Sequence, residues 1–236
     1  MDEQIGFFKI QEGQILVDCI QRMTEADTIR TKAAIEGINR LNRGGKPVNE
    51  EKSKDIVLET KRLILRKMRE DDFENVRRFL ADPEVMYAYE HGFDDQEVRD
   101  WIANNQRRYR EDGFGLWLMI DKKAGQSIGD CGITWQMVNE TPVLEIGYHL
   151  EKEKWHHGYA IEAARACKAY AFETLGADRI TSIIRDTNSA SQKVAVRNGM
   201  KPVETIIKHY RGFTMPHLVY EITREQYEAD QKDSAA

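Results

Sequence analysis

Residues 154–163 read KWHHGYAIEA, so two histidines and a glycine come directly before an amphipathic run. Histidine side chains bind metals and transfer protons, whereas main-chain amides at the start of a helix bind anions. His156 and His157 are adjacent, so their side chains diverge, and no third His or Cys follows at metal-ligand spacing. The stretch therefore predicts a main-chain phosphate or pyrophosphate site and no metal. The alternative interpretation of the same residues is an ordinary loop-to-helix junction with a turn glycine and no ligand.

The run after Gly158 has the periodicity of a helix with small residues on its buried side. Small residues there let the helix axis lie close to a sheet, and glycine lets an anion approach the main chain without meeting a Cβ atom. The absence of G-x-G-x-x-G and of GK[ST] disfavours a dinucleotide fold and a P-loop. The predicted stripe consists of Ala160, Ala164, Cys167, Ala171 and Leu175.

Composition excludes several classes of protein. The chain has 236 residues, of which 41% are hydrophobic, and its formal net charge is −5. Basic and acidic residues are interleaved, so no face for nucleic acid is expected. No apolar run approaches the about 20 residues of a membrane span, and the first residues lack a secretory leader pattern. The 3 cysteines are widely spaced, which suits a reducing compartment. We expect a cytoplasmic protein that binds neither membrane nor nucleic acid.

The patterns of predicted helices, strands and linker residues divide the chain into three parts. Residues 1–50 contain helix-like stretches at 14–23 and 25–43 and the start of a linker rich in Gly and charge, so they predict a helical N-terminal extension. Residues 58–227 alternate strands and helices and predict one domain, and 228–236 are expected to form a C-terminal tail. We expect the extension to pack on the domain or on a second subunit.

The domain is predicted to be α+β, with a mixed sheet of about seven strands and helices on both faces. A meander of three strands joined by short hairpin connections precedes a helix, strand, helix and closing hairpin. Predicted strands are 62–66, 116–121, 127–138, 143–150, 179–184, 202–210 and 216–222, and predicted helices are 70–81, 95–111, 158–175 and 188–198.

Three segments in this order, 58–86, 145–163 and 188–200, carry a family resemblance. They read LETKRLILRKMREDDFENVRRFLADPEVM, EIGYHLEKEKWHHGYAIEA and NSASQKVAVRNGM. Together they resemble the GNAT acetyltransferase superfamily, and within it the ribosomal-protein N-terminal acetyltransferases. The resemblance covers about residues 58–227 and leaves out the N-terminal extension. It implies a mostly antiparallel sheet whose fourth and fifth strands, 143–150 and 179–184, splay apart to admit pantetheine.

The resemblance also implies a cofactor site for acetyl-coenzyme A. The glycine-containing loop of the family matches Trp155, His156, His157, Gly158, Tyr159 and Ala160. By this match, the amides from His156 to Ala160 hold the pyrophosphate, in agreement with the anion site inferred from the residues alone. The amide of Leu150 matches the position that binds the thioester carbonyl, where any apolar side chain serves.

Acyl transfer to an amine needs a proton acceptor, and the departing thiolate needs a hydrogen-bond donor. Glu145 is the candidate base, because the other family position for a carboxylate is Ile183 here; a plain ion pair is the alternative role for Glu145. The tyrosine that many relatives place near the thiolate is replaced by Ala195. Ser191 matches a serine near the coenzyme sulfur, and Asn188 matches a residue that bonds pantetheine or caps the helix.

The sequence thus predicts an N-acetyltransferase that moves an acetyl group from acetyl-coenzyme A to a primary amine, either a protein N-terminus or a small amine. A non-catalytic coenzyme A-binding sensor remains an alternative, because two usual catalytic side chains are missing. Either a monomer or a homodimer is compatible with the sequence. Aromatic residues lie where the resemblance implies an acceptor groove, although aromatics at such spacing more often belong to the core. They are Tyr87, Tyr89, Phe93, Trp101, Trp117 and Trp135.

Overall fold

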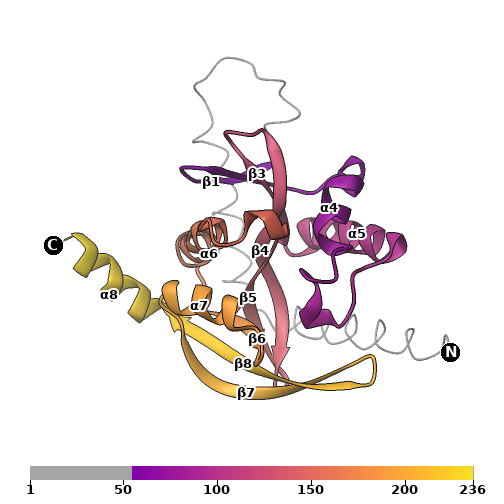
Figure 1. Cartoon of the computed structure of the whole chain (residues 1–236). Helices are drawn as coiled ribbons and strands as arrows, with labels where there is room; N and C mark the ends of the chain where they lie inside the picture. The colour runs from indigo at the N-terminus through magenta and orange to yellow at the C-terminus, as the bar shows by residue number, and fades with distance from the viewer. Residues whose placement is uncertain (1–54, 236) are drawn as a thin grey trace, which may run out of the picture. The chain divides into compact units, whose positions relative to one another are not determined.

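The computed structural model describes residues 55–235, which form a central sheet with helices on both faces (Figure 1). The predicted N-terminal extension, residues 1–50, lies outside the described residues. The strands are β1 (Ile56–Glu59), β2 (Leu63–Arg66), β3 (Leu116–Asp121), β4 (Gln126–Val138), β5 (Thr141–Leu150), β6 (Arg179–Arg185), β7 (Lys201–Tyr210) and β8 (Phe213–Thr223). The α-helices are α4 (Phe73–Leu80), α5 (Asp95–Glu111), α6 (Tyr159–Ala169), α7 (Ser189–Arg197) and α8 (Arg224–Ala235).

Among the described residues, the sheet has 8 strands in the order β1-β2-β3-β4-β5-β6-β8-β7. All neighbours are antiparallel except β5 and β6, so the predicted mixed, mostly antiparallel fold is confirmed. The strand beyond the expected seven is β1, which pairs with β2. Its short run IVLE follows a charged segment, and a strand of four residues carries too little periodicity to be recognised before its partner is known.

Strands β5 and β6 diverge, as expected. Their register contains a single pair, Glu145 with Thr181. Next to this pair, side-chain hydroxyls complete the contact, because Thr181 Oγ1 donates to Leu144 O at 3.0 Å and Ser182 Oγ donates to Ile146 O at 2.9 Å. After Glu145, β5 therefore has no register pair with β6, and the sheet is open between these two strands.

Helix α6 packs on β4 and β5, while α4 lies against the same strands from the opposite face (Figure 1). Ala164, Cys167 and Ala171 of the predicted stripe are buried, and Ala160 and Leu175 at its ends are half-buried. The Cys167 Sγ atom lies 3.6 Å from Cys131 Sγ of β4, which shows how closely the helix approaches the sheet.

The expected α-helix over 158–175 is wrong in its last turn, because Tyr170–Thr174 form a π-helical turn, η4. The wider turn accommodates aromatic rings that face different partners. Tyr170 meets the buried Trp117 edge-to-face at 5.4 Å between ring centroids, and Phe172 stacks on Tyr227 of α8 at 4.7 Å.

The segment expected as a C-terminal tail forms most of α8. This helix begins directly after β8 and is anchored at its start by Arg224, whose Nη2 donates to Phe172 O at 2.8 Å and Ala177 O at 2.7 Å. Its polar sequence has little hydrophobic periodicity, so the helix could not be recognised from the sequence pattern.

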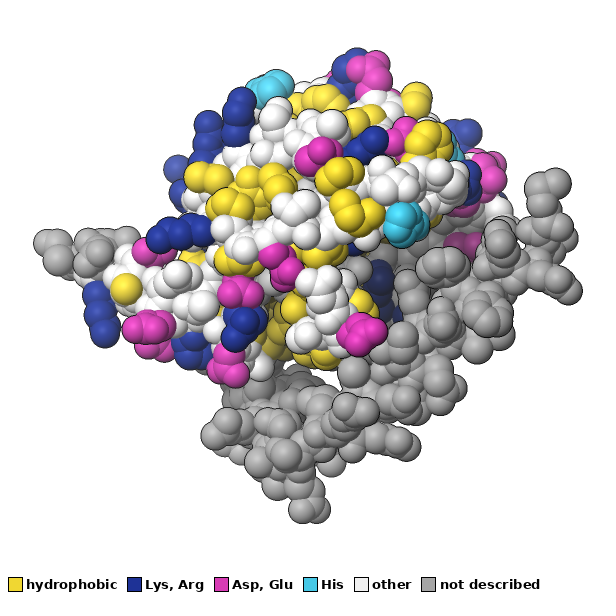
Figure 2. All heavy atoms as spheres, turned by 90° about the horizontal axis from the view of Figure 1, so that it is seen from below, with side chains coloured by type: hydrophobic (Ala, Val, Ile, Leu, Met, Phe, Trp, Pro, Cys, Tyr) yellow, Lys and Arg dark blue, Asp and Glu magenta, His cyan; other side chains and the backbone are white. Residues whose placement is uncertain are grey.

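No helix within residues 55–235 is long and apolar enough to cross a membrane. The surface seen in Figure 2 mixes acidic, basic and hydrophobic side chains.

The turn between β2 and α4 is organised by one buried carboxylate. Asp72 is 3% exposed and accepts two hydrogen bonds of 2.6 Å from the Arg66 guanidinium. The Arg69 main-chain amide and the Asn75 side chain also donate to it. Burial alone would raise the pKa of Asp72, but the bonds from Arg66 and Arg69 outweigh burial and lower the pKa.

We expect Asp72→Asn to lower the free energy of unfolding by about 3 kcal/mol at pH 7, because it leaves Arg66 without its buried counterion. Asp71→Asn, at the exposed neighbouring position, is the control and should change little. Since the folded-state pKa of Asp72 is lowered, its contribution is complete above the ordinary value of 3.8 and is lost as the pH falls through the folded-state value. Urea unfolding at several pH values measures this, and equal effects of both variants would contradict it.

Candidate active site

The loop before α6 has the backbone geometry of an anion site. His156 has φ of 63° and Gly158 has φ of 78°, so two left-handed residues flank His157. This alternation turns successive main-chain amides toward one side, in the arrangement called a nest. Within residues 55–235, the amides from His156 to Ile161 donate to no other main-chain group. An anion at the start of α6 would satisfy several of them and would also meet the positive end of the helix dipole.

Side chains from outside the loop hold it in place. The Trp155 indole donates to Leu150 O at 3.0 Å, and Arg62 Nη1 donates to His157 O at 2.9 Å. The His157 ring donates from Nδ1 to Trp155 O at 2.6 Å, while both histidine side chains remain exposed. The histidines thus shape the loop and border solvent. Within residues 55–235, no three or more His, Cys, Asp and Glu residues come together in a group that could hold a metal ion.

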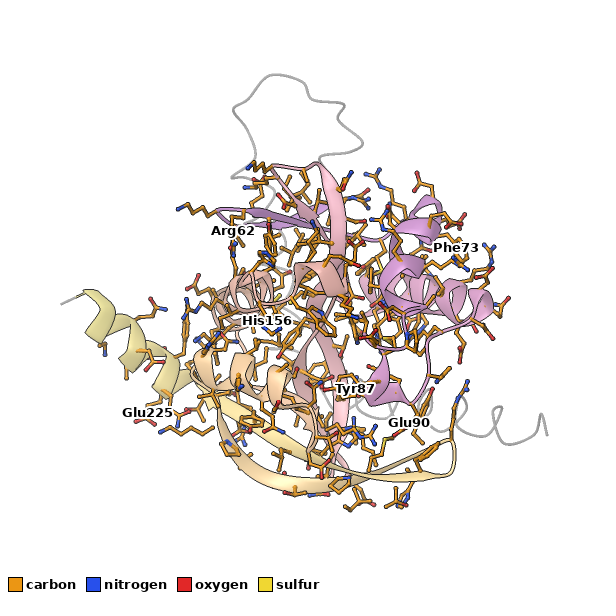
Figure 3. The ribbon with its side chains drawn as sticks, in the orientation of Figure 1. Arg62, Phe73, Tyr87, Glu90, His156 and Glu225 are labelled. Atoms are coloured by element: carbon orange, nitrogen blue, oxygen red, sulfur yellow. The ribbon has the colours of Figure 1, made fainter. Side chains whose placement is uncertain are left out.

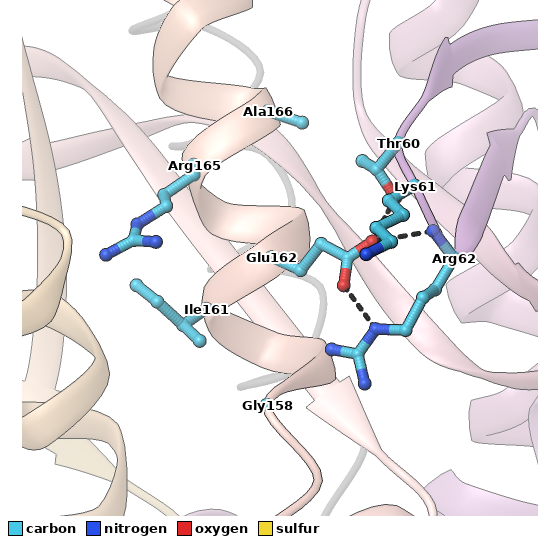
Figure 4. Close-up of a pocket in the computed structure, with 8 residues that line it drawn as sticks. All are labelled: Thr60, Lys61, Arg62, Gly158, Ile161, Glu162, Arg165 and Ala166. Carbon is cyan, nitrogen blue, oxygen red and sulfur yellow. Dashed lines mark hydrogen bonds and ion pairs between the residues drawn. The ribbon is translucent and has the colours of Figure 1, made fainter.

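A cavity of about 610 Å³ lies beside the loop, and Lys61, Arg62 and Arg165 line it together with Gly158 (Figure 4). Arg62 and Glu162 point toward one another there, with Nε and Oε2 2.5 Å apart. Burial would raise the pKa of Glu162, but hydrogen bonds from Thr60 and Arg62 outweigh it and lower the pKa. The carboxylate therefore stays ionised and holds Arg62 at the loop. Lys61 and Arg62 were not predicted as site residues, because they lie on the β1–β2 turn, far away in sequence.

Glu145 occupies the point where β5 and β6 separate. Its Oε1 accepts a hydrogen bond of 3.1 Å from the main-chain amide of Ile183, the residue at the other family position for a carboxylate. Burial raises the pKa of Glu145, while Lys208 and the bond from Ile183 act in the opposite direction. Its carboxyl group thus has a structural bond and, because of its raised pKa, a stronger tendency to accept a proton than an exposed glutamate.

Ser191 lies at the start of α7, directly across the opening from β5. Its main-chain amide donates to Asn188 Oδ1 at 3.0 Å, so Asn188 is the N-cap of α7. The Ser191 hydroxyl donates to the Tyr148 hydroxyl at 2.9 Å, and Tyr148 in turn donates to Ser191 O at 3.0 Å. Tyr148 was not predicted as a site residue. It brings a phenol to the region of α7 where Ala195 replaces the expected tyrosine.

Comparisons with known proteins identify the family. The model for "Acetyltransferase (GNAT) domain" matches residues 62–201. A Bacillus subtilis protein described as uncharacterized, YkkB, is 38% identical over 165 residues, which cover 70% of this chain and 94% of that protein. The chain belongs to the GNAT acetyltransferase family. The family inferred from the sequence is thereby confirmed.

Two further proteins are similar to this GNAT chain. The Aspergillus fumigatus protein named FsC-acetyl coenzyme A-N(2)-transacetylase is 30% identical over 193 residues, covering 75% of this chain and 80% of that protein. A solved structure of RimL, a ribosomal L7/L12 alpha-N-protein acetyltransferase in complex with coenzyme A, has a TM-score of 0.59 and 17% identity, covering 71% of this chain and 97% of that chain. The second likeness shows a shared fold.

On the face of the GNAT sheet that carries α4 and α5, aromatic residues gather near Glu145. Tyr89 contacts Phe93 with ring centroids 5.7 Å apart, and Phe93 contacts Trp101 at 5.8 Å. These three predicted groove residues therefore come together. Trp117 instead lies under η4, and Trp135 pairs with Phe114 away from this group.

The segment between α4 and α5 contains the short helix η2 (Tyr87–Tyr89) and lies beside the β7–β8 hairpin, as Tyr87 and Glu90 show in Figure 3. Two ion pairs of 2.5 Å hold this region together, one between Arg185 and Glu90 and one between Arg211 and Glu97. His149 of β5 meets the same aromatic group, with its ring 5.8 Å from that of Tyr89. Neither the ion pairs nor His149 was predicted as part of the site.

The loop geometry predicts that Gly158 matters more for coenzyme A affinity than the neighbouring histidine rings. We expect Gly158→Val to weaken binding at least about tenfold, because a β-branched residue is strained at φ of 78° and the amides would turn away. His157→Ala should change the affinity little. Isothermal titration calorimetry with coenzyme A measures both.

Gly212→Val provides the matched control, because Gly212 has φ of 83° and open space at its Cβ position, and it lies in the β7–β8 turn. It should lower stability without weakening coenzyme A binding. Intact affinity in Gly158→Val, together with lost affinity in His157→Ala, would return the anion site to the histidines.

Proposed function

We propose that this protein is an N-acetyltransferase that transfers the acetyl group of acetyl-coenzyme A to a primary amine. The observation that carries the proposal is the nest at His156 and Gly158, placed beside the opening between β5 and β6. An anion-binding loop next to an open sheet edge suits a cosubstrate with a pyrophosphate and an amide-containing arm. Membership of the GNAT family agrees with this reading.

In this proposal the main chain binds the cosubstrate. The amides from His156 to Ala160 hold the pyrophosphate, and the basic side chains of the adjoining cavity attract its further negative charge. The Leu150 amide polarises the thioester carbonyl, as an oxyanion donor does in other acyl transfers. Trp155 fixes the spacing between these two groups, because its indole bonds Leu150 O while its main chain begins the loop.

Glu145 is the proposed base for the attacking amine. Amines are mostly protonated at neutral pH, so a proton must leave the nitrogen before it attacks. Burial raises the pKa of Glu145, which makes the carboxylate a better acceptor for that proton. Only the ionised form accepts it, so the rate should fall as the pH falls through this raised value.

Ser191 and Tyr148 are proposed to serve the leaving thiolate. Their hydroxyls are 2.9 Å apart, so either can donate to a sulfur atom while the other supports it. A thiol has an ordinary pKa near about 8.5, and its thiolate is a tolerable leaving group that one hydroxyl bond can assist. Tyr148 therefore offsets the loss of the family tyrosine at Ala195 and favours catalysis over passive binding.

The acceptor is proposed to be a protein N-terminal amine or a small amine. The aromatic group around Tyr89 supplies ring faces that attract ammonium, and Glu145 supplies negative charge beside them. The name of the RimL structure, a ribosomal-protein acetyltransferase, favours a protein N-terminus among these acceptors.

The decisive test of the activity is thiol release from acetyl-coenzyme A with a panel of acceptors. The panel contains peptides with free N-terminal alanine or serine, spermidine and an aminoglycoside, and mass spectrometry records the gain of an acetyl group. We expect sustained turnover with at least one acceptor. Coenzyme A binding without turnover on any of them would support the non-catalytic sensor instead.

Two substitutions of Glu145 separate its catalytic and structural roles. Glu145→Gln keeps an oxygen that can accept from the Ile183 amide, so its stability should stay within about 0.5 kcal/mol of the wild type while kcat falls on the order of 10²-fold. Glu145→Ala also removes the hydrogen bond and should lose about 1 kcal/mol of stability. Steady-state kinetics and urea unfolding measure the two effects.

The control is Glu204→Gln on β7, where the carboxylate bonds only an exposed asparagine side chain in the described structure. Its turnover should equal that of the wild type. Full turnover in Glu145→Gln would assign Glu145 a structural role alone.

A further inference from the structure

A second proton-handling group lies on β5, four residues after Glu145. His149 and Asp130 are register partners on β5 and β4, and His149 Nδ1 lies 2.8 Å from Asp130 Oδ1. The Asp130 side chain is 0% exposed, and its other oxygen accepts a hydrogen bond of 3.0 Å from the Trp101 indole. The main-chain amide of His149 also donates to Asp130 Oδ1, at 3.2 Å. A buried carboxylate with three donors is fully satisfied and fixed in direction.

This arrangement determines which nitrogen of His149 is available. Asp130 accepts bonds from His149 Nδ1 and Trp101, so Nδ1 carries a proton and Nε2 of the neutral ring carries a lone pair. In the described part of the chain, Nε2 makes no hydrogen bond. The His149 side chain is 12% exposed, so the ring lies at the edge of the site and retains some contact with solvent. A histidine oriented by a buried carboxylate is the usual arrangement of a general base.

The ring lies where the acceptor amine is expected. Residues two apart on a strand face the same way, so His149 shares a face with Glu145. Tyr89 and Trp101 border the ring, with centroids at 5.8 and 5.5 Å. Tyr89 and His149 both interact electrostatically with Glu145. The histidine, the glutamate and two aromatic rings thus surround one region of the acceptor face.

The reaction removes two protons from the acceptor nitrogen. An ammonium ion and an acetyl thioester give an amide, a thiol and one proton. The new C–N bond forms as the C–S bond breaks, and the nitrogen loses two protons in total. One of them ends on the thiolate sulfur and the other enters solvent. A single carboxylate can hold only one proton at a time, whereas an imidazole nitrogen offers a second acceptor on the same face.

We propose that His149 is a catalytic residue whose Nε2 accepts one of the two protons from the acceptor nitrogen, and that Asp130 is the positioning residue that fixes the tautomer with a lone pair on Nε2 and directs this nitrogen at the acceptor. The proposal rests on the proposed acetyltransferase function. It assigns the second proton transfer to a pair that the resemblance to the family did not supply.

The kinetic test uses the acceptor that gives the highest turnover in the panel of peptides, spermidine and aminoglycoside. His149→Asn retains a donor for Asp130 but no proton acceptor, and its kcat should fall on the order of 10²-fold with unchanged coenzyme A affinity. His149→Ala should be equally slow and should regain activity when imidazole is added. His209→Asn, at an exposed position on β7, is the matched control and should keep full turnover. Unchanged kcat in His149→Asn, or no rescue by imidazole, overturns the proposal.

A second test needs no acceptor. Nitrogen-15 NMR of the histidine rings in the full-length protein should show neutral His149 as the tautomer protonated at Nδ1. Asp130→Asn should change this tautomer ratio, because an amide can also donate to the ring. A wild-type ring protonated at Nε2 would have no lone pair for the acceptor and would overturn the proposal. If the wild type transfers no acetyl group to any acceptor, the proposed function is wrong. If the wild type is active but the His149 variants or the tautomer contradict the expectation, the proposed function stands and the role of the His149–Asp130 pair is wrong.

Discussion

The site depends on the separation of two parallel strands in the middle of a sheet. After the pair of Glu145 and Thr181, β5 and β6 no longer share a ladder, and main-chain groups on both would lack partners. Side chains compensate for this loss. Ser182 reaches the Ile146 carbonyl, and Glu145 accepts from the Ile183 amide. The open edge is therefore stable without closure and leaves room for an extended ligand.

Each functional group takes its position from this opening. Strand β5 forms one edge of the opening; it ends at Leu150 and is followed by the loop that contains Gly158. The start of α7 faces the other edge, and the Tyr148–Ser191 pair links the two sides. Helix α6 lies close to the sheet because its contact surface consists of alanine and cysteine, which brings the first turn of the helix down to the strand ends. Glu145 and His149 alternate with Tyr148 along β5, so one strand serves both the acceptor face and the thiolate face.

Much of this was predictable from the sequence. The meander and the helices around the sheet follow from periodicity, and the anion loop follows from a glycine before a helix with small residues. The family resemblance predicted that β5 and β6 diverge. Contacts between distant segments were not predictable, because nothing local in the sequence marks them. Arg62 meets His157 across 95 residues, and the polar α8 is a helix because Arg224 and Tyr227 contact η4.

The pairing of His149 with Asp130 also could not be predicted from the sequence. The sequence places His149 on the same face as Glu145, but only the register of β4 against β5 puts Asp130 beside it. The sequence alone does not explain why the carboxylate of Asp130 lies within the strand SIGDCGITW; the three hydrogen-bond donors seen in the structure do. Buried polar residues within apolar strands are therefore the positions where sequence patterns are least informative and structure most useful.

The left-handed conformation of His156 has a thermodynamic consequence. A non-glycine residue in this region raises the free energy of the folded chain by about 1–2 kcal/mol, and the surrounding bonds of Trp155 and Arg62 maintain it without a ligand. The loop is thus already in its anion-binding shape, so little conformational entropy is lost when an anion arrives. Coenzyme A binding should accordingly show the heat-capacity change of surface burial alone, without the larger change that accompanies folding of a loop.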